Sequence, residues 1–93
     1  MMKLGEITLA VVDDHKLFRE GLVGLLRKSS VCFRVLWEAY DGLAFLDNLN
    51  SDLPDVVLMD ISMPGMDGIE ATRRAIALYP GIRIIALSMY GEQ

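Results

Sequence analysis

Residues 55–60 read Asp-Val-Val-Leu-Met-Asp, and residues 7–14 read Ile-Thr-Leu-Ala-Val-Val-Asp-Asp. Each stretch is an apolar run of strand length that ends in aspartate, so Asp13, Asp14 and Asp60 are predicted to follow two buried strands. If these strands are neighbours in one parallel sheet, their carboxyl ends share the crevice in which open α/β sheets bind ligands. Because three carboxylates at one edge repel one another, the two stretches also predict a bound cation.

The rest of the chain alternates short apolar segments with helical ones, which is the βαβα pattern of a parallel sheet covered by helices. The predicted strands cover residues 6–12, 33–38, 56–59 and 83–87. The predicted helices cover about 16–28, about 42–50, and a segment that begins after Asp67 and stops at Pro80-Gly81. The predicted fold class is therefore α/β.

Local patterns predict which surfaces are buried and how the helices begin. All predicted strands except 33–38 are nearly continuous aliphatic runs, which indicates burial on both faces, whereas 33–38 alternates like a half-exposed edge strand. Asp14 and Asp41 are predicted to cap the first two helices, and Asp67 with Glu70 predicts a capping box for the third. One face of the first helix is apolar, with Leu17, Phe18, Leu22, Leu25 and Leu26 at helical spacing.

Composition limits the classes of function. The 93 residues are 53% hydrophobic, as expected for one small globular domain. The formal net charge of -4 argues against direct binding of this segment to nucleic acid. A single cysteine, Cys32, excludes an internal disulfide, and no run approaches the roughly 20 apolar residues of a membrane span. The start of the chain has no secretory pattern, so we expect a soluble cytoplasmic protein that does not associate with membranes.

The acidic crevice suggests phosphoryl chemistry. An all-oxygen site with few carboxylates favours Mg²⁺, with Asp13 and Asp14 as ligands and a backbone carbonyl just past Asp60 as a third. Asp60 stands alone, so it is the best candidate for a nucleophile that takes up a phosphoryl group. The Ser88 hydroxyl, at the end of the fourth predicted strand, is placed to hydrogen-bond a phosphoryl oxygen.

Simpler roles compete with this interpretation. An Asp-Asp pair before a helix often serves only as a cap, and an aspartate after a strand often only forms a turn. His15, next to the pair, is more often a solvated residue at a helix start than a metal ligand.

Three segments carry a resemblance to a known family: 58–70 (LMDISMPGMDGIE), 11–15 (VVDDH) and 86–90 (ALSMY). Together, in this order, they closely resemble the receiver domain of two-component response regulators. The resemblance implies a flavodoxin-like, doubly wound sheet with strand order 2-1-3-4-5. It is closest to regulators that carry a LuxR-type helix-turn-helix output domain, which would bind DNA.

The resemblance also implies a role for each matching residue. Asp60 matches the phosphoacceptor that takes a phosphoryl group from a histidine kinase. Asp13 and Asp14 match the acidic pair that binds Mg²⁺ together with Asp60, and the backbone carbonyl of Ser62 matches a further ligand. Ser88 matches the switch residue that turns toward the phosphoryl group.

Residues 1–93 match only the N-terminal portion of the family pattern, with order 2-1-3-4 and without the fifth strand and the last two helices. No lysine of the chain matches the family's catalytic lysine, so we expect metal binding to be more robust here than phosphorylation. The exposed fourth strand and uncovered sheet faces predict a homodimer, which could form by exchange of elements.

Three functions remain in competition. The first is a non-enzymatic phosphoacceptor that controls an output domain. The second is a Mg²⁺-dependent phosphohydrolase with Asp60 as nucleophile, although Ser62 stands where a general acid would be expected. The third is a dimerisation module without chemistry.

Overall fold

The computed structural model describes residues 6–63 and 68–87 of the chain. These residues form one parallel sheet with strand order β2-β1-β3-β4. Its strands are β1 (Ile7–Val12), β2 (Phe33–Ala39), β3 (Val56–Asp60) and β4 (Arg83–Leu87). The helices between them are α1 (Lys16–Lys28), α2 (Gly42–Ser51) and α3 (Gly68–Leu78). The predicted α/β class and strand order are confirmed, and every predicted element lies at its expected place in the chain.

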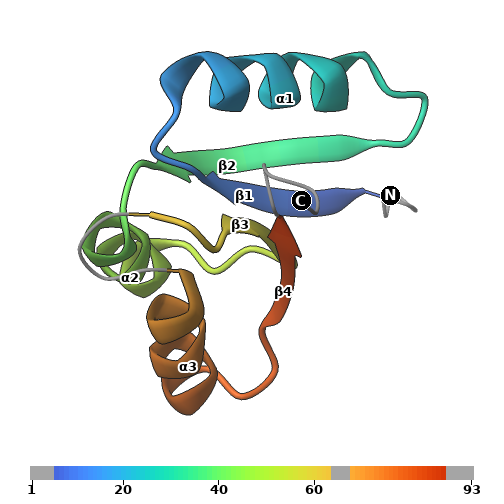
Figure 1. Cartoon of the computed structure of the whole chain (residues 1–93). Helices are drawn as coiled ribbons and strands as arrows, with labels where there is room; N and C mark the ends of the chain where they lie inside the picture. The colour runs from blue at the N-terminus through green and yellow to red at the C-terminus, as the bar shows by residue number, and fades with distance from the viewer. Residues whose placement is uncertain (1–5, 64–67, 88–93) are drawn as a thin grey trace.

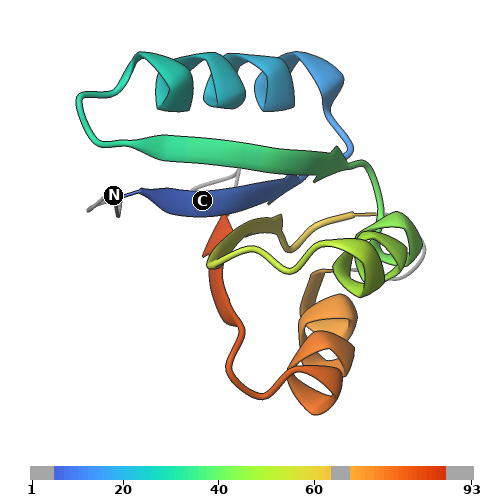
Figure 2. The same cartoon turned by 180° about the vertical axis from the view of Figure 1, so that it is seen from behind.

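The helices cover both faces of the sheet, with α1 on one side and α2 and α3 on the other (Figures 1 and 2). The main core lies on the side of α2 and α3 and includes small side chains of α3. Phe45 of α2 is fully buried there, and its ring centroid lies 6.2 Å from that of Trp37. Other members of this core are Ala10, Val12, Ala39, Leu49, Val57, Met59, Met63, Ala71 and Ala75.

The edge strands differ in how well the sequence predicted them. β2 is an edge strand with exposed Arg34 and Glu38, as expected from its alternation. β4 was predicted to be buried on both faces, and this is wrong, since Ile85 is 53% exposed. On that side of the sheet α1 contacts β1 and β2. The described residues therefore leave Ile85 of β4 exposed on one face of the sheet, which agrees with the predicted uncovered sheet faces.

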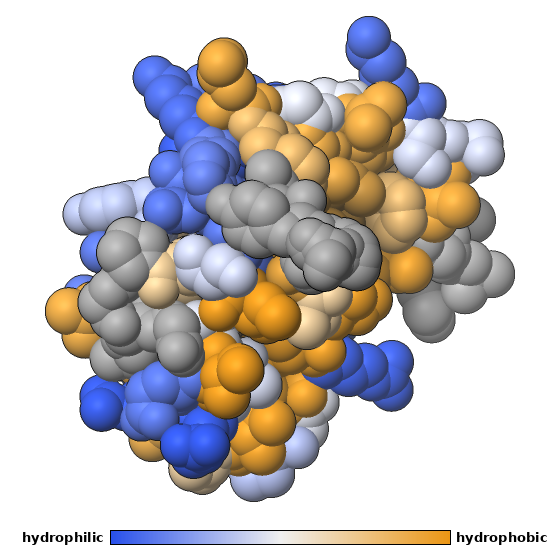
Figure 3. All heavy atoms as spheres, in the orientation of Figure 1, coloured by the Kyte–Doolittle hydropathy of each residue, from blue (hydrophilic) through white to orange (hydrophobic). Residues whose placement is uncertain are grey.

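The apolar face of α1 is only partly buried. Val23 is the buried residue of this helix, whereas Leu17 is 84% and Leu25 is 70% exposed. Among the described residues, the contacts of α1 with β1 and β2 therefore bury only part of its apolar stripe. Figure 3 shows hydrophobic side chains on this view of the molecule from α1 at the top down to the region of α3. No helix of the described residues is long and apolar enough to cross a membrane.

The helix caps follow the predictions in part. Asp41 caps α2, because its side chain accepts a hydrogen bond of 2.8 Å from the Ala44 N–H. The predicted cap at Asp14 is wrong: His15 occupies the N-cap position of α1 and makes no capping hydrogen bond with its side chain. Asp67, the expected cap of α3, lies outside the described residues, and Glu70 pairs with Arg73 and Arg74 on the same helix.

Candidate functional site

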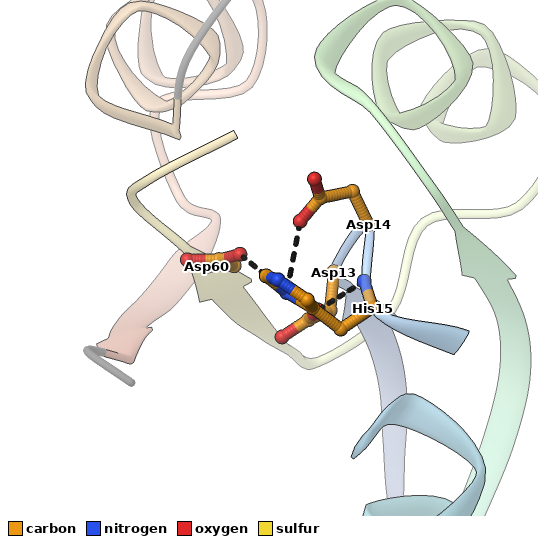
Figure 4. A group of neighbouring side chains, drawn as sticks. All are labelled: Asp13, Asp14, His15 and Asp60. Atoms are coloured by element: carbon orange, nitrogen blue, oxygen red, sulfur yellow. Dashed lines mark hydrogen bonds and ion pairs between the residues drawn. The ribbon is translucent and has the colours of Figure 1, made fainter. Parts of the chain in front are cut away.

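The three aspartates singled out from the sequence lie together at the carboxyl edge of the sheet (Figure 4). β1 and β3 are paired in parallel, with Val12 opposite Met59, so the residues that follow these two positions end up side by side. Asp13 and Asp60 are fully buried, and the Asp14 side chain is 27% exposed. The sheet register thus assembles the predicted acidic crevice.

Each buried aspartate uses one carboxylate oxygen locally. Asp13 Oδ1 accepts a hydrogen bond of 2.7 Å from the His15 N–H, and Asp60 Oδ1 accepts one of 2.9 Å from the Ser62 N–H. The simpler role of Asp60 in turn formation is therefore real, but it accounts for only one of the two oxygens. The second oxygen of each carboxylate remains available to a ligand.

Three carboxylate oxygens in this crevice are buried without a hydrogen-bond partner among the described residues, namely Asp13 Oδ2, Asp14 Oδ1 and Asp60 Oδ2. A buried acceptor without a partner costs roughly 1–3 kcal/mol, and more when it is charged. Three such oxygens at one point are explained neither by capping nor by turn formation. They form a donor set that suits a hard divalent cation, which would neutralise the charge and replace the lost hydration.

The electrostatics of the site act most strongly on Asp60. Burial raises the pKa of this carboxyl, because it disfavours the charged form. The Ser62 N–H opposes this shift of the pKa, whereas the nearby charges of Asp13 and Asp14 add to it. A group whose pKa is perturbed by burial and by specific charged neighbours in a crevice is a typical functional residue.

His15 is an exposed residue at the start of α1, as expected, and its ring also lies beside the acidic cluster. Its Nδ1 is 3.2 Å from Asp13 Oδ1, 3.1 Å from Asp14 Oδ1 and 4.0 Å from Asp60 Oδ2. The side chain is 46% exposed, so the ring both contacts the acids and remains open to solvent. The only signal in the sequence was the position of His15 directly after the acidic pair.

Arg19 supports the loop that carries the acidic pair, a role that was not predicted from the sequence. Its Nη1 donates a hydrogen bond of 2.6 Å to the carbonyl oxygen of Asp13, and its Nε donates one of 3.1 Å to Glu38. The Asp13 N–H in turn donates to the carbonyl of Ala39 at 3.0 Å. The loop is therefore attached to α1 and to the end of β2.

The backbone after Asp60 is held from two directions. The Ile61 N–H donates a hydrogen bond of 3.3 Å to the carbonyl of Leu87 at the end of β4. On the other side, α3 begins so close that a Cβ added at Gly68 would meet the Asp60 carbonyl oxygen and lie 2.6 Å from Ile61 Cα. Glycine is thus required for this approach of helix and strand end.

Two predicted site features are not tested by the structure. Ser62 follows the strand as expected and is positioned through its N–H, but the proposed role of its carbonyl as a metal ligand stays a prediction. Ser88, the predicted switch residue, lies outside the described residues.

A cavity of the described residues lies away from this site. It has a volume of about 730 Å³ and is lined by Ile7, Val56 and Arg83, the first residues of three strands, together with loop residues. It therefore lies at the amino ends of the strands, opposite the acidic crevice. Its lining includes Asp55, whose side chain accepts a hydrogen bond of 2.9 Å from the Thr8 N–H.

Known proteins with similar sequences are transcriptional regulators. The transcriptional regulatory protein DegU of Brevibacillus brevis is 38% identical over 88 residues, which cover 95% of this chain and 37% of DegU. The probable transcriptional regulatory protein NarL of Mycobacterium tuberculosis is 39% identical over 87 residues, which cover 94% of this chain and 40% of NarL. The chain thus spans about two fifths of the length of these relatives.

Solved structures agree with these similarities. The signal receiver domain of NarL from Mycobacterium tuberculosis superposes with a TM-score of 0.84 at 39% identity, covering 94% of this chain and 69% of that one. A LuxR-family response regulator from Aurantimonas gives a TM-score of 0.85 at 33% identity. The match covers 95% of this chain and 61% of that one. Residues 9–93 match the family described as the response regulator receiver domain. The chain therefore belongs to the response regulator receiver domain family of two-component signal transduction.

Proposed function

We propose that residues 1–93 are the N-terminal portion of a receiver domain in which Asp60 accepts a phosphoryl group from a histidine kinase. The observation that carries this proposal is the state of the two Asp60 oxygens. Oδ1 is held by the Ser62 N–H at 2.9 Å, whereas Oδ2 is buried and unpartnered beside two further carboxylates. One oxygen is thus fixed and the other is available for reaction.

The same crevice is proposed to hold Mg²⁺ through Asp13, Asp14, Asp60 and the backbone carbonyl of Ser62. Support comes from the donor set, since ligand oxygens of the three aspartates lie within 4.8 Å of one another. Mg²⁺ prefers a few carboxylates together with water and phosphate oxygens. When bound, the ion would offset the negative charge that collects around a transferred phosphoryl group.

The chemistry proposed for Asp60 is a single group transfer. Asp60 Oδ2 attacks the phosphorus atom of a phosphohistidine, the new O–P bond forms, and the P–N bond breaks. The electron pair of that bond returns to the histidine of the kinase, and an acyl phosphate remains on Asp60. The Ser62 N–H keeps the carboxylate oriented during the transfer, because it stays bound to Oδ1.

The proposed consequence of phosphorylation is control of a DNA-binding output domain on the same protein, with Ser88 as the switch. Support comes from relatives that are transcriptional regulators and from the similar response regulator RcsB of Salmonella, one structure of which is bound to promoter DNA. The cytoplasm is the proposed location, and the chain itself is proposed to be a signalling module rather than an enzyme.

Self-association of this chain is also proposed. β4 presents an unpaired edge within the described sheet, and its Ile85 is 53% exposed. Leu17 and Leu25 on α1 are also largely exposed. Uncovered edges and apolar patches of this kind favour a homodimer. Light scattering at micromolar concentration is expected to show a dimer whose fraction falls in Ile85→Lys, and a compact monomer for the wild-type chain would contradict this proposal.

The decisive experiment is incubation of the chain with Mg²⁺ and a small-molecule phosphodonor such as acetyl phosphate. We expect a hydroxylamine-labile phosphoryl group that does not exceed one per chain, is absent from Asp60→Asn and is retained by Asp47→Asn, since Asp47 is an exposed residue of α2. Multiple turnover of a phosphoester would instead favour the phosphohydrolase. No label on the chain, and none on a version extended along the receiver domain, would favour a module without chemistry.

A further inference from the structure

The position of His15 within the acidic crevice has no role in the mechanism above. Its Nδ1 lies 3.1 to 3.2 Å from oxygens of Asp13 and Asp14 and 4.0 Å from Asp60 Oδ2. Dashed lines in Figure 4 mark interactions between His15 and the aspartates. A single imidazole N–H can serve one acceptor well. It does not satisfy three, since Asp14 Oδ1 and Asp60 Oδ2 remain without a hydrogen-bond partner.

The distances around Nδ1 match those between donors that share one metal ion. With metal–nitrogen and metal–oxygen bonds of about 2.0–2.2 Å, neighbouring ligand atoms lie roughly 2.9 to 3.4 Å apart and opposite ones roughly 4.2 Å apart. The 3.1 Å contact of Nδ1 with Asp14 Oδ1, an oxygen without a hydrogen-bond partner, falls in the first range. The 3.2 Å contact is with Asp13 Oδ1, the oxygen that also accepts the His15 N–H. The 4.0 Å separation from Asp60 Oδ2 is close to the second.

We propose that His15 Nδ1 is a ligand of the metal site, so that the crevice binds borderline transition-metal ions such as Co²⁺ more tightly than Mg²⁺. This inference rests on the metal site proposed above and adds a nitrogen donor to it. Nitrogen ligands favour first-row transition metals over Mg²⁺, which prefers oxygen. In this arrangement the ring proton is on Nε2, and Nδ1 offers its lone pair to the ion.

The backbone supports the same ring position. The His15 N–H donates to Asp13 Oδ1 at 2.7 Å, which fixes the start of α1 against the acidic pair and directs the His15 side chain over the crevice. This contact uses the peptide group, so it is retained when the side chain is changed. The ring nitrogen is therefore removable without loss of the local backbone geometry.

Calorimetry with Co²⁺ and Mg²⁺ on the full, tag-free chain tests the inference, because His15 is the only histidine. In His15→Phe, which keeps a planar ring without nitrogen, we expect Co²⁺ affinity to fall about 10- to 100-fold. Mg²⁺ affinity is expected to change less than about twofold, because this ion gains little from imidazole. In the wild-type chain loaded with Co²⁺, proton NMR is expected to show one strongly shifted imidazole N–H resonance, which His15→Phe lacks.

The outcomes are separable. Unchanged Co²⁺ affinity in His15→Phe, or no shifted imidazole resonance in the wild-type chain, overturns the inference. An equal loss for both ions overturns it as well, because His15 would then only shape the loop, and His15→Gln provides a second variant should the first fail to fold. Asp13→Asn is expected to lower the affinity for both ions. Co²⁺ binding that is unchanged in Asp13→Asn would take place outside the crevice and would overturn the inference. Absence of Mg²⁺ binding in the wild-type chain would instead refute the proposed magnesium site.

Discussion

Replacement of Asp60 by asparagine is expected to make the metal-free protein more stable, although it removes the proposed phosphoacceptor. Asp60 is fully buried, its Oδ2 has no partner among the described residues, and two further carboxylates are adjacent. An asparagine keeps an oxygen for the Ser62 N–H and places an N–H₂ donor beside Asp13 and Asp14. Relief of one buried, unsatisfied charge of this kind is worth about 1–3 kcal/mol.

The dependence of this gain on pH follows from the raised pKa of Asp60. The folded state binds the Asp60 proton more tightly than the unfolded chain, in which the pKa is about 3.9. Stability from this carboxyl is therefore full below pH 4 and is lost as the pH rises through the raised folded pKa. The advantage of Asp60→Asn should be close to zero at low pH and largest near pH 7.

Urea unfolding at fixed protein concentration, with a chelator present, provides the measurement. Trp37 is the single tryptophan, and its ring packs beside Phe45, so its fluorescence reports on the core. At pH 7, the free energy of unfolding of Asp60→Asn should be about 1–3 kcal/mol higher than that of the wild-type chain. The free energy of unfolding of Asp47→Asn should stay within about 0.5 kcal/mol of the wild-type value.

Saturating Mg²⁺ should reduce the difference in stability between Asp60→Asn and the wild type, because the wild-type chain is expected to bind the ion more tightly. A ligand at 100 times its Kd adds about 2.7 kcal/mol to the free energy of unfolding of the protein that binds it. Two results would refute the reasoning. One is an Asp60→Asn chain that is no more stable than the wild type without metal. The other is a gain of equal size at pH 4 and pH 7, which would point to packing rather than to charge.

Three further substitutions test the supports of the site. Gly68→Ala should cost about 1–3 kcal/mol, because the new Cβ meets backbone at Ile61, whereas Gly24→Ala in α1 should be neutral or stabilising because that position is open. An equal fall of the urea midpoint in Gly68→Ala and Gly24→Ala would contradict the expected close contact at Gly68. Asp41→Ala should lower the stability by about 1 kcal/mol through loss of the α2 cap, and Asp41→Asn should recover most of it in the same assay. Arg19→Ala should weaken Mg²⁺ binding in calorimetry by releasing the Asp13 loop, and unchanged affinity would exclude this positioning role.

The fold was largely predictable because each buried strand is a short apolar run that ends in a polar turn. The parallel pairing follows from the helical segments between the strands, and the pairing of β1 with β3 was implied by the family resemblance. Burial was less predictable at Ile85 and Leu17, because local sequence reports what a residue prefers and not whether another element covers it. Hydrophobic side chains were therefore expected in the core where the described structure leaves them exposed.

The site was predictable to the extent that it depends on where strands end. Asp13, Asp14 and Asp60 occupy their positions through chain direction and register alone, which a sequence pattern can indicate. The contributions of Arg19 and Gly68 depend on contacts with backbone atoms of other segments, at Asp13 and after Asp60 respectively. Such contacts leave no periodic trace in the sequence, and only the three-dimensional arrangement defines them.

The acidic crevice combines opposing effects on stability and on function. The unpartnered oxygens of Asp13 and Asp60 destabilise the metal-free protein, and the same oxygens would supply the affinity for a cation. The Ser62 N–H binds only Oδ1 of Asp60. This hydrogen bond orients the carboxylate and leaves Oδ2 free to bind a ligand. The backbone that follows is bound to the end of β4 through the Ile61 N–H. The residue after Asp60 is thus hydrogen-bonded to β4, the outermost described strand. Neutralisation of the charge on Asp60 should therefore change the local stability of β4 more than that of the core.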